Sequence, residues 1–125
     1  MFNYAFENLE VWQESRKLAK AIYQITASFP KSEAFGLVNQ VRRAAVSVCS
    51  NIAEGSARTS SKDQAYFYQI SYSSLMEVLC QLIISSDLSY LSESDYQENR
   101  RSIDKIARQI SKLRSSALAR IEKKN

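Results

Sequence analysis

Residues 101–123 read RSIDKIARQISKLRSSALARIEK, and this stretch decides the fold class. Its apolar side chains recur at intervals of 3, 4, 3, 4 and 4 residues and form one seam: Ile103, Ile106, Ile110, Leu113, Ala117 and Ile121. Such spacing places side chains on one face of an α-helix, so the stretch predicts a long amphipathic helix that buries this seam. The seam must be covered by other elements of the chain.

The opposite side of the same helix carries a basic stripe, about 150° from the seam at 100° per residue. The stripe consists of Arg101, Lys105, Arg108, Lys112 and Lys123, and is flanked by Arg114, Arg120 and Lys124. Residues 100–125 carry nine basic and two acidic side chains, a net charge of +7, whereas residues 1–99 have a net charge of −3. Cations near a helix C-terminus also favour the helix dipole, but Arg101 and Lys105 lie too early for that. A linear basic stripe is typical of nucleic-acid binding.

Glycine, proline and serine signals divide the rest of the chain. Pro30 is expected to end a first helix, and Gly55 to close a second one in a left-handed conformation. Ser60 and Ser92 are expected N-caps, each followed by acids in the first turn. These signals predict a single domain over residues 1–125 with four helices near 8–28, 33–54, 61–91 and 94–122. Short connections make neighbouring helices antiparallel, so we expect an all-α, up-down-up-down four-helix bundle.

The third predicted helix is apolar on more sides than one bundle contact requires. No Lys or Arg occurs from Asp63 to Asn99, and Glu77 is the only charge between Asp63 and Asp87. A helix that is apolar on most sides is either central or shared between subunits, and a four-helix bundle has no central helix. We therefore expect a homo-oligomer that buries this helix and part of the first. A monomer with several exposed tyrosines is the alternative.

A polar row runs beside the apolar seam of the second predicted helix: Gln40, Arg43, Ser47, Asn51 and Glu54. One interpretation is an ordinary solvated face. The other is a close helix contact, permitted by the small Ala44–Ala45 pair, in which the row is hydrogen-bonded. Glu77 also needs a cation, and we predict an Arg43–Glu77 pair, within or between subunits, that fixes register more than it adds stability.

The composition excludes several mechanisms. With no His, the chain cannot form a Ser-His-Asp triad, a Cys-His dyad, a His-ligated zinc site or a Glu-x-x-His di-metal site. Cys49 and Cys80 are expected to be buried small hydrophobes, and the isolated Glu54 and Glu77 look structural. We therefore predict a non-enzymatic protein without a metal or cofactor. The first residues do not read as a signal peptide and no segment reads as a membrane span, so a cytoplasmic protein with no membrane partner is expected.

Residues 40–55, QVRRAAVSVCSNIAEG, carry a family resemblance. Together with FENLEVWQ at 6–13, Phe29-Pro30, Phe35-Gly36-Leu37 and the Ser73-Ser74 pair before Glu77, they resemble the bacterial four-helix-bundle family named after the protein encoded in 23S ribosomal RNA intervening sequences. The resemblance runs from about residue 6 to 118. It implies a ring-like homopentamer and a relation to the accessory subunits of diversity-generating retroelements, which bind a reverse transcriptase and nucleic acid. It carries over Gln40, Arg42, Arg43, Ser47, Asn51, Glu54 and Glu77 as pattern positions, without making them a site.

Two functions of different classes fit these observations. In the first, an oligomer repeats the basic helix around one assembly and binds the backbone of RNA or DNA. Tyr96 is the only aromatic residue on that helix, so we expect backbone contact with weak sequence specificity rather than base stacking. In the second, the chain is a structural or adaptor protein, and the basic helix docks a protein partner such as a reverse transcriptase.

Overall fold

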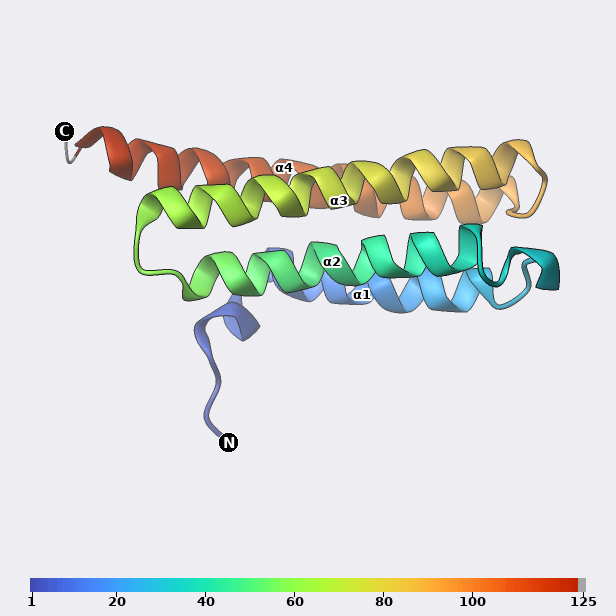
Figure 1. The fold of residues 1–125 in the computed structure, drawn as a ribbon, viewed down its shortest axis with the longest axis horizontal. Coiled ribbons are helices and arrows are strands. Elements are labelled where there is room, and N and C mark those ends of the chain that lie inside the picture. Colours follow the sequence, from blue (N-terminus) through green and yellow to red (C-terminus); the bar gives the residue numbers. More distant parts are fainter. Residues whose placement is uncertain (124–125) are drawn as a thin grey trace.

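The computed structural model describes residues 1–123, and within that range its regular elements are all helical. The main helices are α1 (Glu10–Thr26), α2 (Leu37–Ala57), α3 (Ser61–Asp87) and α4 (Glu93–Lys123). Two short 3-10 helices precede α1 and α2: η1 (Ala5–Asn8) and η2 (Lys31–Glu33). In Figure 1 successive long helices are joined at alternate ends of the molecule. α1 contacts α2 and α4, and α3 contacts the same two helices, so the four close into one bundle. The predicted all-α, four-helix fold is confirmed.

The core contains four of the six seam residues that the sequence predicts for α4, whereas Leu113 is partly buried against it and Ile121 is half-buried outside it. Ile103, Ile106 and Ile110 are fully buried, and they pack in one cluster with residues of the other three helices, among them Ile22 and Leu75. Each such side chain contributes roughly 1.5–3 kcal/mol of hydrophobic stabilisation. The burial of this seam fixes how α4 is rotated in the bundle, and therefore which of its residues face solvent.

Serine caps confirm two of the predicted helix starts. The Ser60 hydroxyl accepts a hydrogen bond from the Asp63 backbone N–H at 3.1 Å, and Ser92 accepts one from Asp95 at the same distance. Each cap satisfies one of the backbone donors left unpaired at a helix N-terminus. The capping signals are local, which is why the sequence locates these two starts to within a residue.

One predicted boundary in each of three helices is wrong. α1 ends at Thr26 rather than near 28, and α2 begins at Leu37 rather than near 33, because η2 and the turn before Gly36 occupy the connection. α3 ends at Asp87 rather than near 91, because the next residues form a Schellman motif. Ser89 takes the left-handed conformation (φ 62°), and the Tyr90 N–H donates to the Ser85 carbonyl at 3.0 Å.

Gly55 does not close α2 in a left-handed conformation, so that prediction is wrong. α2 continues to Ala57, and Gly55 is buried inside it. The reason is the neighbour on α3: a Cβ atom at position 55 would lie 2.6 Å from Cε1 of Tyr68. The glycine therefore provides room for the ring of Tyr68, which is itself buried. Burial also raises the pKa of the Tyr68 hydroxyl.

The two cysteines are not paired with each other, and they differ in exposure. Cys49 is half-buried, and burial raises the pKa of its thiol to about 11. Cys80 is exposed on α3, so the prediction that both thiols are buried is wrong for Cys80. No helix within residues 1–123 is both long enough and apolar enough to cross a membrane.

Candidate nucleic-acid interface

The basic stripe lies on the solvent side of α4, opposite the buried isoleucines. Arg101, Arg108, Lys112 and Lys123 are all exposed, and none of them forms an ion pair within the described residues. Arg120 donates to Ser61 Oγ at 3.4 Å and to Gln64 Oε1 at 2.7 Å, which ties the last turns of α4 to the start of α3. The flanking Lys124 lies outside the described residues. Four of the five stripe cations thus keep their charge available to solvent or to a ligand.

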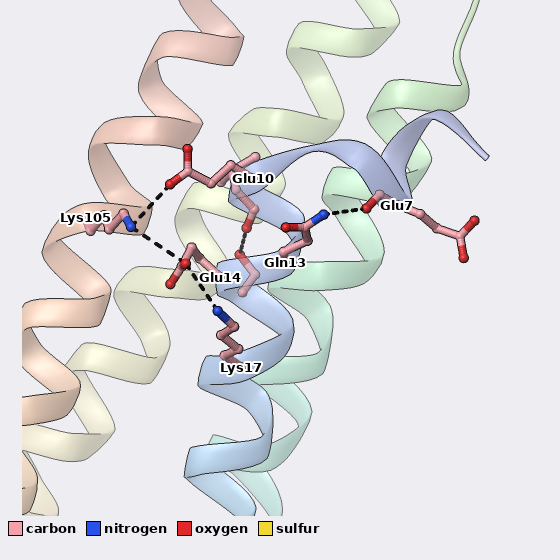
Figure 2. A network of polar contacts seen from close by, with 8 residues as sticks. Glu7, Glu10, Gln13, Glu14, Lys17 and Lys105 are labelled. Atoms are coloured by element: carbon pink, nitrogen blue, oxygen red, sulfur yellow. Dashed lines mark hydrogen bonds and ion pairs between the residues drawn. The ribbon is translucent and has the colours of Figure 1, made fainter. Parts of the chain in front are cut away.

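Lys105 differs from the rest of the stripe because α1 supplies it with two carboxylates. Its Nζ lies 3.3 Å from Oε1 of Glu10 and 3.6 Å from Oε1 of Glu14, as Figure 2 shows. Glu14 also lies 3.7 Å from Nζ of Lys17. The hydrogen bond to Glu10 and the charge of Glu14 raise the pKa of the Lys105 ammonium. A phosphate approaching Lys105 would meet both carboxylates, so Lys105 is the least available cation of the stripe.

A groove between α3 and α4, the α3–α4 groove, runs along one flank of the stripe. One hollow of about 390 Å³ is lined by Tyr72, Ala107, Arg108, Ser111, Lys112 and Ser115. An adjoining hollow of about 200 Å³ is lined by Gln69, Tyr72, Ile110, Ser111, Arg114 and Ser115. The two share three residues and form one groove with three cations. No carboxylate lines either hollow. The Nε–H of Arg114 is buried and has no hydrogen-bond partner within residues 1–123.

Tyr72 is the residue of this surface that sequence reasoning missed. Within α4 itself the one aromatic side chain is Tyr96, near the start of the helix. Tyr72 belongs to α3, and only the packing of α3 on α4 places it beside Arg108 and Lys112. The available signal was that the third predicted helix is apolar on more than one side, but the sequence does not show which helix covers the side that holds Tyr72.

The polar row of α2 is partly a helix contact and partly a solvated face. The hydroxyls of Ser47 and Ser74 lie 2.8 Å apart and join α2 to α3. Asn51 donates to the Ser47 carbonyl at 2.9 Å and to the Ser47 hydroxyl at 3.0 Å. Glu54 instead points to solvent and pairs with Arg58 at 2.9 Å on its own helix. The hydrogen-bonded helix contact thus holds for Ser47, Asn51 supports Ser47 from within α2, and Glu54 lies on a solvated face.

The Arg43–Glu77 pair does not form within the protomer, so that form of the prediction is wrong. Both side chains line a hollow of about 280 Å³ between α2 and α3, together with Gln40, Ala44 and Ser47, yet they make no ion pair. Glu77 accepts instead from Gln81, whose Nε2 is 3.3 Å from Glu77 Oε1 and 3.3 Å from Gln40 Oε1. An exposed Arg43–Glu77 pair would add little to the stability of the fold, because ordering two long side chains costs conformational entropy. A pair between subunits stays a prediction.

Within residues 1–123 no three Cys, Asp or Glu side chains come together as a set that could hold a metal ion. The recognisable features of this fold are therefore its four helices, its core pattern and its charged outer face. A family model described as 23S rRNA-intervening sequence protein matches residues 7–112.

The chain belongs to the 23S rRNA-intervening sequence protein family. A search of curated proteins found no match. Among solved structures, the chain is similar to a protein with unknown function from the S23 ribosomal protein family of Bacteroides thetaiotaomicron. The TM-score is 0.75 and the identity 19%, with 83% of this chain and 97% of that chain covered. At this identity the likeness shows a shared fold.

The residues matched to the 23S rRNA-intervening sequence protein family include the polar row of α2 and most of the basic stripe. The match ends at Lys112, so Arg114 and Lys123 lie beyond it. The α3–α4 groove therefore straddles the end of the matched range, with Tyr72 and Arg108 inside and Ser115 outside.

Proposed function

We propose that this chain is a non-enzymatic homo-oligomer that binds the sugar–phosphate backbone of RNA or DNA through the outer face of α4. The observation that carries the proposal is an exposed row along one face of α4 that pairs with no carboxylate among residues 1–123: Arg101, Arg108, Lys112 and Lys123. Cations that no protein carboxylate neutralises are the ones that a polyanion can use.

The dimensions of the row suit a nucleic-acid backbone. Arg101 and Lys123 are 22 positions apart, which at 1.5 Å per residue is about 33 Å along α4. This length is close to one turn of duplex DNA. Each backbone contact releases condensed counterions, so affinity falls with salt by about 0.9 log units per log unit of salt for each phosphate that B-DNA contributes. Contact of this kind is weakly sequence-specific, because phosphates carry no sequence information.

Assembly of several copies would multiply the charge of this face. Large apolar side chains are exposed on α2 and α3, including Val46, Ile83 and Ile84. α3 also lacks cations from Asp63 onwards, so a second copy would meet little charge on it. We propose that these surfaces join copies of the chain, five of them as the family resemblance implies, and that Arg43 of one copy pairs with Glu77 of the next.

The assembly is tested by light scattering on the full chain and on charge variants. R43E and E77R should each lower the assembly mass, and the R43E/E77R double variant should restore it. A monomeric wild-type mass at micromolar concentration would refute the oligomer. An unchanged mass in both single variants would refute the pair.

Binding is tested by fluorescence anisotropy with a labelled 20-base-pair DNA duplex and a structured RNA hairpin over a range of salt concentrations. For the duplex, R108Q and K112Q should each reduce the salt slope by about 0.9. K105Q should change it less, because two carboxylates already neutralise Lys105. K31Q removes one charge from η2, outside the stripe, and is the matched control with an unchanged slope.

Absence of binding to both probes at low salt would refute the proposal, as would equal effects of R108Q and K31Q. If an acidic protein partner is retained after nuclease treatment while both nucleic acids fail to bind, the adaptor function is favoured instead.

A further inference from the structure

The α3–α4 groove owes its openness to a strip of small residues on α4. Ala107, Ser111 and Ser115 recur every four residues and face Tyr72 across the groove. Longer side chains at these three positions would fill the space between the helices. The larger hollow, about 390 Å³, is shallow and open to solvent. A molecular fragment can therefore lie against Tyr72 beside the cations.

The groove is built from groups that donate hydrogen bonds to anions. Arg108, Lys112 and Arg114 contribute three positive charges, and Ser111 and Ser115 contribute hydroxyls. The Nε–H of Arg114 has no hydrogen-bond partner within residues 1–123 but is buried, so the cations that the groove exposes to a ligand are Arg108 and Lys112. A phosphate oxygen is an acceptor that suits Arg and Lys donors.

Tyr72 adds an aromatic ring to the groove, which binding of a phosphate does not require. It is half-buried, packs on one side against the core cluster, and lines both hollows. Proteins that bind single strands combine a positively charged groove with an aromatic ring on which a base stacks. In a duplex the faces of the bases are covered by their neighbours, so only an unpaired nucleotide can offer a base to Tyr72.

We infer that the α3–α4 groove binds an unpaired nucleotide, with its phosphate held by Arg108 and Lys112 and its base packed against Tyr72. The inference rests on the proposed function and deepens it, because the stripe alone recognises only the backbone. The chain then prefers single strands over duplexes of the same length.

The preference is measured by anisotropy at one fixed salt concentration with a labelled 12-nucleotide oligoadenylate and a labelled 12-base-pair RNA duplex. The wild-type chain should bind the single strand about tenfold more tightly than the duplex, which is the size of effect expected from one stacked base. Y72L should abolish this preference and leave duplex affinity unchanged. Y66L is the matched control, since Tyr66 is an exposed tyrosine of α3 that does not line the groove.

A second pair of variants tests the groove without removing an aromatic ring. S111E and S116E place the same charge on exposed positions of α4, but only Ser111 lines the groove. S111E should weaken single-strand binding at least fivefold more than S116E. Because both serines lie on the surface, helix content by circular dichroism should match the wild type in each variant.

The outcomes separate the inference from the proposed function. Equal wild-type affinity for single strand and duplex, or equal effects of Y72L and Y66L, overturns the groove and leaves the backbone proposal standing. Binding of a 12-residue polyglutamate as tight as that of the oligoadenylate also overturns it, because charge alone would then explain binding. Loss of all binding at low salt refutes both.

Discussion

The contact between Gly55 and Tyr68 predicts that G55A lowers the stability of the protein, although Gly→Ala in a helix usually raises it. In the interior of a helix, Gly→Ala normally stabilises by about 0.8–1 kcal/mol, because alanine has the higher helix propensity. At position 55 the added Cβ would lie 2.6 Å from Cε1 and 2.9 Å from Cδ1 of Tyr68. Tyr68 is only 4% exposed and is enclosed by the core cluster, so the ring has little space to withdraw.

The magnitude follows from these two opposing effects. Inserting a methyl group into a well-packed core costs about 1–3 kcal/mol, and the enclosed ring places G55A in the upper part of that range. After the gain in helix propensity, the expected net loss is about 1–2 kcal/mol. For a chain of 125 residues, 1 kcal/mol corresponds to a shift of roughly 4 °C, so Tm should fall by about 4–8 °C.

Thermal and urea unfolding of four proteins tests this reasoning: wild type, G55A, Y68L and the double variant. In the Y68L background the clash is absent, so G55A should there raise stability by about 0.8–1 kcal/mol. The sign of the alanine effect thus reverses with the residue at position 68. A higher Tm for G55A in the wild-type background, or additive effects of the two substitutions, would refute the proposed role of Gly55.

Three further predictions concern a turn, the thiols and an ion pair. S89G should stabilise the chain by about 0.5–1 kcal/mol in urea unfolding, because Ser89 holds a left-handed conformation that glycine adopts without strain; a loss of stability would contradict it. At pH 8, Ellman's reagent should modify one thiol quickly, and C80S should abolish that phase, because Cys80 is exposed whereas Cys49 has its pKa raised to about 11; a fast phase that survives in C80S would contradict it. The raised pKa of Lys105 means that its pairing stabilises the fold below the ordinary lysine pKa of 10.5 and that this contribution is lost as pH rises through the raised value. The stability difference between wild type and K105Q should therefore be constant from about pH 7 to pH 10 and shrink above about pH 10.5; a difference that grows with pH would be inconsistent with the pair.

Features that depend on nearby residues could be predicted from the sequence. The caps at Ser60 and Ser92 and the burial of Ile103, Ile106 and Ile110 follow from spacing within one or two helical turns, and the structure has them. Gly55 shows the limit of such reasoning. A glycine near a helix end fits both a left-handed cap and a close approach, and only Tyr68, thirteen residues further on, decides between them.

The candidate site divides in the same way. The exposure of Arg101, Arg108 and Lys112 follows from the seam on the opposite side of their helix. The neutralisation of Lys105 does not follow from the sequence of α4, because Glu10 and Glu14 lie more than 90 positions earlier in the chain. Nor does a lone Glu77 reveal that its carboxylate accepts from Gln81 rather than pairing with Arg43.

The sequence by itself determined that this protein is a set of amphipathic helices with a basic last member, because periodicity and capping are properties of short segments. Only the tertiary structure decided which cations keep their charge available and that Tyr72 shares a groove with two of them. The physical reason is that the rotation and packing of whole helices determine which side chains of different helices meet. Burial of the entire core fixes that rotation, and no local stretch of residues does so.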